Sequence, residues 1–283
     1  MFSGRLLKLS PLASNGSDTM QSLVFLCLHS TITLIVMFFS SFYSTFFIEE
    51  KFGFNRTDIQ TWVKDQVKLS ALIYILRVIS GTGILTIVKH TGDLFFLYLW
   101  LFIGAFLVLM LSISSTLVLP WFFTLKPLEQ EPLRQRIEKL AFTLGFPLSD
   151  LRVIDSSSRS AHSNAFFIGF PWKKSIVLFD TLIEQASIEE VEAVVAHELG
   201  HWKGGHSWWT MLLTQIHLGY TYCLFPLFLK NQSFFKAFGF IDARPIAVGL
   251  QLYLLLLNCT DPLVRAAGMR VARSHEYEAG TTR

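Results

Sequence analysis

The sequence predicts a mainly α-helical membrane protein in which a bundle of apolar spans carries an inserted α+β domain. Three observations support this fold class. Of the 283 residues, 52% are hydrophobic and only 16% are charged, and the mean hydropathy is +0.46, which is high for a soluble domain. Several apolar runs reach the roughly 20 residues that a helix needs to cross a bilayer. One long segment between these runs is rich in charge.

The N-terminal region, residues 1–122, contains three candidate spans, at 20–48, 69–88 and 94–122. The first and third contain no charged residue, and the second contains only Arg77. An ionised side chain within a span is costly in lipid. We therefore expect Arg77 to pair inside the bundle or to face a water-filled cavity.

Residues 123–206 are predicted to face water, because they hold 20 of the 45 charged side chains. The apolar pattern predicts a helix over 133–144 and short strands at 151–155, 164–170 and 175–179. Stretches rich in Ser, Pro and Lys separate these elements. The segment is therefore the α+β domain, and it lies between spans.

Two further candidate spans, at about 208–229 and 245–258, lie within residues 207–263. The second of them is short for a span. A polar C-terminal segment, residues 264–283, follows. Because a chain that crosses a membrane twice returns to its starting side, we expect this segment to lie on the same side as the charged domain.

A helix within the charged domain is predicted to begin after Ser187 and to end near Lys203. Ser187 and Glu190 form the capping-box pattern of a helix start. The Gly204–Gly205 pair can end the helix.

His197, Glu198 and His201 give this helix the HExxH pattern. Residues four apart leave the same helical face, so both imidazoles can hold one metal ion. Zinc held by two histidines and a carboxylate keeps a fourth position for water and lowers the pKa of that water to roughly 7. Glu198 can take the proton and pass it to a leaving amine, as in a zinc peptidase. The alternative is a helix whose histidines are only solvated. The predicted helix start and stop agree better with the setting that the metal-binding motif requires.

The third ligand must come from elsewhere in the chain, and Glu276 in the C-terminal segment is the candidate. The two intervening spans return it to the membrane side of His197 and His201. His275 and Glu278 are neighbours that could substitute. The residues alone leave these alternatives open.

Composition also excludes other classes of protein. The net charge is only +3 and the basic residues are dispersed among acids, so no nucleic-acid partner is expected. Cys27, Cys223 and Cys259 all lie in apolar runs. A disulfide framework or a thiolate metal site is therefore not predicted.

Four segments occur in an order and spacing that resemble those of the zinc-dependent CAAX prenyl proteases of the endoplasmic reticulum, the type that matures yeast a-factor. These segments are SSSRSAHSNAFFIGF, SIVLFDTLIE, VVAHELGHWKGGH and RSHEYEAG. The resemblance implies a multi-span membrane bundle with an inserted gluzincin-like protease domain that binds one zinc ion. It also implies a multi-pass protein of the endoplasmic reticulum membrane with its catalytic face in the cytosol, and the inner nuclear membrane as a second location.

The resemblance assigns roles to individual residues. It implies that zinc is bound by His197, His201 and Glu276, and that Glu198 is the catalytic base. It also implies that an edge strand beginning at Asn164 and Ala165 pairs with the substrate backbone by β-augmentation. The alternative for this strand is an ordinary internal position in the sheet.

Three further positions can be compared with the family. His206 matches a family position, but its nine-residue offset from His197 and the glycine break predict a structural or supporting role and not a metal ligand. Gly280 stands where the family has an aspartate that can orient a zinc-bound imidazole. The chain has about two spans fewer than the family at its start and stops at Arg283 before a further cytosolic segment, as a truncated member would.

The preferred function is removal of the C-terminal tripeptide of farnesylated CAAX proteins by an integral membrane zinc endopeptidase, with prenylated proteins or peptides and the bilayer as partners. A catalytically silent or truncated scaffold of the same family is the alternative, suggested by Gly280 and the missing ends. An intramembrane-cutting metalloprotease is the third option. The three glutamates in SIEEVEAVV, just before His197, oppose it because they are costly in lipid.

Overall fold

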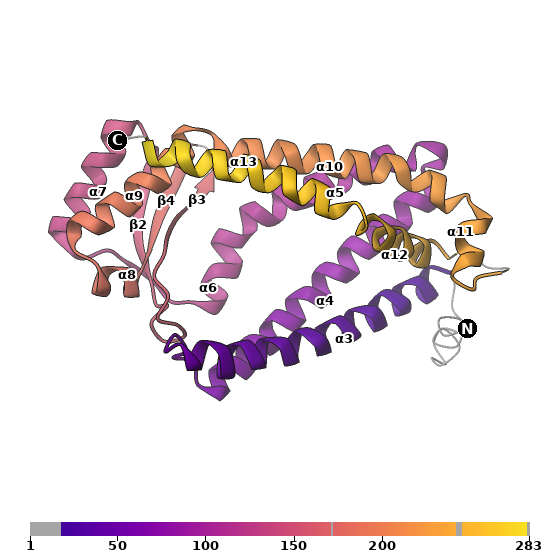
Figure 1. Cartoon of the computed structure of the whole chain (residues 1–283), viewed down its shortest axis with the longest axis horizontal. Helices are drawn as coiled ribbons and strands as arrows, with labels where there is room; N and C mark the ends of the chain where they lie inside the picture. The colour runs from indigo at the N-terminus through magenta and orange to yellow at the C-terminus, as the bar shows by residue number, and fades with distance from the viewer. Residues whose placement is uncertain (1–17, 171, 242–244, 282–283) are drawn as a thin grey trace. The chain divides into compact units, whose positions relative to one another are not determined.

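The computed structural model describes residues 18–170, 172–241 and 245–281, and it is mainly helical with one small sheet (Figure 1). This confirms the predicted fold class. The chain divides into two compact units. Unit 1 comprises the residues up to Phe39, Gln66–Leu107 and Leu212–Ala266, and unit 2 comprises Ser40–Asp65, Val108–Met211 and Ala267 onward. The four consecutive segments proposed from the sequence stay a prediction.

Four stretches within the described residues are long and apolar enough to cross a membrane: Met20–Glu49, Ile59–His90, Gly92–Ile113 and His206–Leu229. Their main helices are α3 (Asp18–Tyr43), α4 (Ile59–His90), α5 (Phe95–Ile113) and α10 (His206–Leu229). A fifth span requires that α12 (Ile246–Leu257) and most of α13 (Asp261–Thr281) count as one broken span. The uncertain fifth span of the sequence prediction thus corresponds to the shortest of these apolar helices.

Unit 1 is held together by aromatic packing between α5, α10 and α12. Leu99, Phe225 and Tyr253 are fully buried at its centre. The hydroxyl of Tyr253 donates a 2.6 Å hydrogen bond to the carbonyl of Thr221, which satisfies a polar group inside an apolar core. Other helical pieces of the described chain are short: η1 (Ser44–Glu49), η2 (Gly92–Leu94), η3 (Ser114–Val118), α6 (Leu119–Phe122) and α11 (Gln232–Ala237).

Unit 2 contains a four-stranded sheet in the order β1-β2-β4-β3. The strands are β1 (Leu125–Pro127), β2 (Leu148–Ile154), β3 (Ala165–Phe170) and β4 (Lys173–Phe179). The central pair, β2 and β4, is parallel, and the two edge strands are antiparallel to their neighbours. The three predicted strands are confirmed, and β1 was not predicted. β3 lies at an edge of the sheet, which excludes the internal position considered for it.

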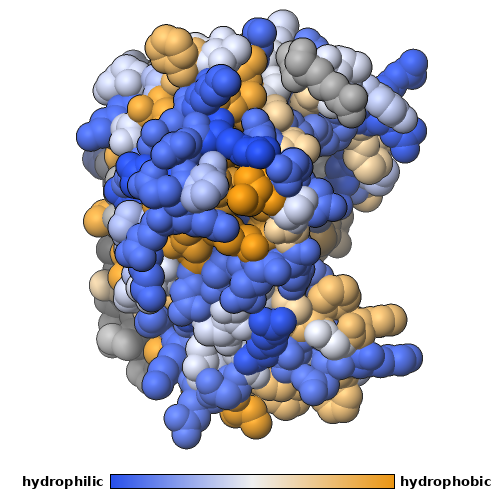
Figure 2. Space-filling view, turned by 90° about the vertical axis from the view of Figure 1, so that its left-hand side faces the viewer, coloured by the Kyte–Doolittle hydropathy of each residue, from blue (hydrophilic) through white to orange (hydrophobic). Residues whose placement is uncertain are grey.

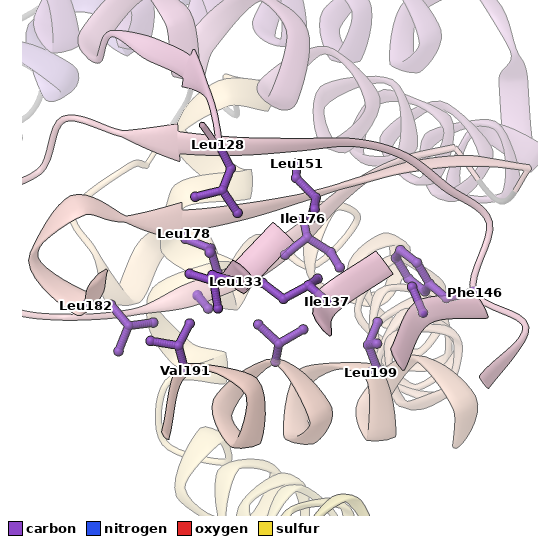
Figure 3. Close-up of a cluster of buried hydrophobic side chains, with 13 residues drawn as sticks. Leu128, Leu133, Ile137, Phe146, Leu151, Ile176, Leu178, Leu182, Val191 and Leu199 are labelled. Carbon is purple, nitrogen blue, oxygen red and sulfur yellow. The ribbon is translucent and has the colours of Figure 1, made fainter. Parts of the chain in front are cut away.

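Two helices cover the sheet of unit 2 and bury its core (Figure 3). They are α7 (Glu131–Leu144) and α9 (Ile188–Lys203), and the short α8 (Asp180–Gln185) precedes α9. Figure 3 shows side chains of both helices pointing toward the strands. The buried cluster includes Leu133 and Ile137 of α7, Val191 and Leu199 of α9, and Ile176 and Leu178 of β4.

The surface of the molecule that carries α7, α8 and α9 is largely hydrophilic (Figure 2). This surface agrees with the prediction that the charged segment faces water. α9 is 16 residues long and is not among the candidate spans of the described chain. The packing of α9 against the sheet of unit 2 therefore gives no support to the intramembrane-cutting alternative.

The start of α9 is fixed by the predicted capping box. The hydroxyl of Ser187 accepts from the backbone N–H of Glu190, and the carboxylate of Glu190 accepts from the backbone N–H of Ser187 at 2.7 Å. We expect Ser187→Ala to lower the free energy of unfolding of unit 2 by about 1 kcal/mol, because the backbone N–H of Glu190 loses its acceptor and the carboxylate of Glu190 loses the hydroxyl donor. Denaturant unfolding measures this change, with exposed Ser163→Ala as the control; equal effects of the two variants would contradict it.

Asp180, at the first position of α8, accepts hydrogen bonds from the backbone N–H groups of Ser156, Ser157 and Thr181 and from the hydroxyl of Ser157. Burial raises the pKa of Asp180, but these hydrogen bonds outweigh burial and hold the pKa below its usual value. A carboxyl group whose pKa is lower in the folded chain than in the unfolded chain stabilises the folded state. This contribution is fully present above pH 4, which is about the pKa of the group in the unfolded chain, and it is lost as the pH falls through the pKa of the group in the folded chain.

We therefore expect the stability difference between the unsubstituted chain and Asp180→Asn to be constant above about pH 5 and to shrink below about pH 4. Denaturant unfolding at a series of pH values measures it. A difference that stays unchanged down to pH 3 would contradict the assignment of the lowered pKa to Asp180.

Candidate metal centre

α9 carries the HExxH residues on the side away from the core. Val195 and Leu199 are four positions apart and are fully buried in the core of unit 2. At about 100° per residue, His197 and His201 leave the opposite side of the helix, and Glu198 leaves it between the two faces. All three side chains are half-buried, and the two imidazoles leave the helix on the side where a third ligand can meet them.

α13 supplies acids from its last turns. Ala279 is buried and His275, four positions earlier, is half-buried, so these two residues mark the packed side of the helix. Glu276 and Glu278 fall on either flank of this side, at about 80° from its centre. The two carboxylates therefore reach different neighbours, although only one residue separates them in the sequence.

The structure brings His197, His201 and Glu276 together, as the sequence predicts. The Nε2 atoms of the two histidines are 3.1 Å apart, and Oε2 of Glu276 lies 3.2 Å from Nε2 of His197 and 3.5 Å from Nε2 of His201. A tetrahedral site with bonds of about 2.0 Å has ligands about 3.3 Å apart. The three donor atoms thus fit one zinc-sized ion, and two imidazoles with one carboxylate are a donor set that zinc prefers. Their role as ligands stays a prediction.

The local environment shifts two pKa values in directions that suit this chemistry. Burial raises the pKa of Glu198, and the negative charge of Glu276 adds to this, against the opposing effect of His197. Burial also lowers the pKa of His201, despite the opposing charge of Glu276. A neutral imidazole is the form that binds a metal, and a carboxylate of raised pKa accepts a proton more readily near neutral pH.

His206 and the two alternative ligands lie next to this cluster but outside it. His206 is 4% exposed, and its Nδ1 lies 2.9 Å from Nδ1 of His201, on the side of that ring away from Glu276. The rings of His206 and His275 are stacked, with centroids 4.1 Å apart. Oε2 of Glu278 lies 3.3 Å from Nε2 of His206, whereas the described donor atoms that could hold one metal ion belong to His197, His201 and Glu276. Geometry thus favours Glu276 over His275 and Glu278 as the third ligand. The contact between Glu278 and His206 was not predicted from the sequence.

The start of β3 lies beside α9 at the free edge of the sheet. The carbonyl of Asn164 accepts from the N–H of Phe179 in β4, and the side-chain oxygen of Asn164 accepts from the N–H of Ala165 at 2.8 Å. Asn164 is exposed and Ala165 is buried. The predicted edge position is therefore present, while the binding role of the two residues stays a prediction.

Comparison with known proteins gives two family matches. A family described as CAAX prenyl protease N-terminal, five membrane helices, matches residues 2–124, and Peptidase family M48 matches residues 127–282. The probable CAAX prenyl protease 1 of Schizosaccharomyces pombe is 41% identical over 244 residues, which are 84% of this chain and 50% of the relative. CAAX prenyl protease 1 of Saccharomyces cerevisiae is 37% identical over 282 residues, which are 93% of this chain and 61% of the relative.

A solved structure agrees with these sequence matches. The crystal structure of S. mikatae Ste24p matches with a TM-score of 0.89 at 35% identity, covering 94% of this chain and 65% of that one. The chain therefore spans 50% to 65% of the length of these three relatives.

The M48 match covers more than half of the chain and includes every residue of the centre. Together with the N-terminal match and the apolar helices, it makes the chain a multi-pass membrane protein whose family implies a bound metal. The chain belongs to peptidase family M48.

Proposed function

We propose that the chain is an integral membrane zinc metalloendopeptidase that removes the C-terminal tripeptide of farnesylated CAAX proteins. The observation that carries this proposal is the trio of donor atoms of His197, His201 and Glu276, 3.1 to 3.5 Å apart, beside half-buried Glu198. The substrate class rests on relatives named CAAX prenyl protease 1 and on the sequence resemblance.

His197, His201 and Glu276 would hold one zinc ion. When bound, zinc acts as a Lewis acid and makes water nucleophilic at neutral pH. Glu198, whose pKa is raised, would first take a proton from water and would then pass it to the leaving amine. Because α9 is anchored through Leu199 in the core, the positions of His197, Glu198 and His201 are fixed relative to one another.

β3 would hold the peptide backbone in register. Because Asn164 bonds inward to β4, the alternation of an antiparallel pair directs the backbone groups of Ala165 and Phe167 toward the free edge. The N–H of Ala165 is occupied by the side chain of Asn164, so a substrate strand displaces that side chain as it pairs. Main-chain pairing demands little side-chain sequence, which suits a substrate recognised by its lipid.

The same proposal gives the location. The chain would be a multi-pass protein of the endoplasmic reticulum membrane, with its metal centre on the cytosolic face and the inner nuclear membrane as a second site. The hydrophilic surface over α7, α8 and α9 supports a centre exposed to water beside the bilayer (Figure 2).

The test uses the purified full chain in detergent, loaded with zinc. It is given a peptide with a farnesylated CAAX end and the same peptide without the lipid, and mass spectrometry follows release of the tripeptide. We expect release from the farnesylated peptide only, and loss of release when a chelator removes zinc. Glu198→Gln should keep its zinc and lower kcat by roughly 10²- to 10⁴-fold, the usual contribution of a general base.

Two outcomes would overturn the proposal. Equal turnover by Glu198→Gln would remove the proposed proton transfer. One zinc ion per chain without release from either peptide would instead make the chain a silent scaffold of its family.

A further inference from the structure

His206 is a buried polar residue at the start of α10 that the proposed reaction does not use. Only 4% of it is exposed, yet both of its ring nitrogens have a polar neighbour. Nδ1 faces Nδ1 of His201 at 2.9 Å, and Nε2 faces Oε2 of Glu278 at 3.3 Å. The three side chains thus form a continuous hydrogen-bonded row from α9 through α10 to α13.

The direction in which protons are donated along this row follows from the position of the three proposed ligand atoms of His197, His201 and Glu276. Nε2 of His201 faces His197 and Glu276, so it must offer a lone pair if it binds a metal. The proton of a neutral His201 then lies on Nδ1 and is donated to Nδ1 of His206. His206 consequently carries its own proton on Nε2 and donates it to the carboxylate of Glu278. Every donor in the row meets an acceptor.

We propose that His206 and Glu278 are positioning residues that hold His201 in its metal-binding tautomer and ring orientation. This inference rests on the proposed function, because it assumes that His201 binds a metal. Partners behind a metal-bound histidine typically fix its tautomer and raise its basicity. Here the carboxylate acts through a second imidazole, because Glu278 contacts His206 while Glu276 contacts the ligand histidines.

The packing around His206 fixes its ring in the orientation that this row needs. His275 stacks on it with an interplanar angle of 5°. On another side the ring lies against Gly204, where an added Cβ would collide with Nε2, Cδ2 and Cε1 of His206. The φ of Gly204 is −71°, which any residue can adopt, so the need for glycine there is space for the imidazole.

Two substitutions of His206 separate positioning from packing. His206→Asn keeps an acceptor oxygen near the place of Nδ1 but loses the stacked ring. His206→Phe keeps the ring and its burial but loses both nitrogens. A positioning role predicts that His206→Phe binds zinc 10- to 100-fold more weakly, the usual cost of losing an outer partner, and that His206→Asn recovers much of the loss. A role in packing alone predicts the reverse order.

Glu278→Gln tests the far end of the row. We expect it to weaken zinc binding by about tenfold, the low end of the same range, because the carboxylate is 63% exposed. Glu184→Gln, an exposed residue of α8, is the control with the same change of charge and should keep its affinity.

The measurements are zinc affinity of the full chain by competition with a chelating dye, the visible spectrum of the cobalt-substituted chain, and thermal unfolding of the metal-free chain. We expect lower affinity and an altered cobalt spectrum for His206→Phe, with metal-free stability close to that of the unsubstituted chain. Unchanged affinity and spectrum in His206→Phe would overturn the inference and leave the proposed function standing. If the unsubstituted chain binds zinc but releases no tripeptide, the proposed function fails while the affinity series still decides this inference.

Discussion

Replacing Glu276 with alanine is expected to lower the affinity of the chain for zinc by more than about a hundredfold and to abolish peptide cleavage with it. Loss of a residue that supports a metal ligand costs roughly 10- to 100-fold, and loss of the ligand itself removes a direct bond as well. Two imidazoles alone also leave the ion without the carboxylate that completes a three-ligand catalytic site.

We expect the fold to be unchanged by this substitution, so a lower zinc affinity would result from the lost carboxylate and not from unfolding. The side chain of Glu276 is 63% exposed and lies in α13, where alanine is the best helix former. Surface substitutions of this kind usually change the free energy of unfolding by less than about 0.5 kcal/mol. Dye competition measures the affinity, and thermal unfolding of the metal-free chain checks the fold.

Tyr277→Phe is the matched control, because Tyr277 is the adjacent residue of α13 and is 73% exposed. It should bind zinc like the unsubstituted chain. Wild-type affinity in Glu276→Ala would show that Glu276 is not the third ligand. His275 and Glu278, the two neighbours that the sequence left open, would then be the candidates for the third ligand.

The features that the sequence predicted well are those set by short intervals along the chain. The four-residue spacing of His197 and His201, and the three-residue spacing of Ser187 and Glu190, determine local helix geometry wherever the helix packs. Apolar runs reveal spans for the same reason, since each run is a property of consecutive residues. The sequence argument for Glu276 used a count of two intervening spans, and that count stays a prediction, because the second span requires α12 and most of α13 to count as one broken span.

The features that the sequence missed depend on which way an element faces. Glu276 and Glu278 have nearly the same sequence context, and only the orientation of α13 sends one to the ligand histidines and the other to His206. Burial of His206 would have been the useful signal, but it depends in part on His275 and Glu278, which lie 69 and 72 positions away, so a local pattern does not reveal it. β1 was missed because three residues are too few to show alternation, and its position is set by pairing with β2.

Leu199→Ala is expected to lower the free energy of unfolding of unit 2 by about 2–5 kcal/mol. Leu199 has no exposed surface and points into the core near Phe146 and Ile137 (Figure 3). Truncation loses the transfer free energy of the buried atoms and leaves a cavity that the covered sheet cannot close completely. Phe142→Ala is the control, because this side chain of α7 is larger but 87% exposed, and its loss should cost less than about 0.5 kcal/mol.

The consequence for the metal centre follows from the position of Leu199 between Glu198 and His201 in α9. A helix with a weakened anchor samples more orientations, so its imidazoles spend less time at the 3.1 Å separation that suits one ion. Zinc binds the folded form, so saturating zinc should recover part of the lost stability. Denaturant unfolding with and without zinc measures both effects. A loss below about 1 kcal/mol without zinc would mean that Leu199 does not anchor α9 in this core.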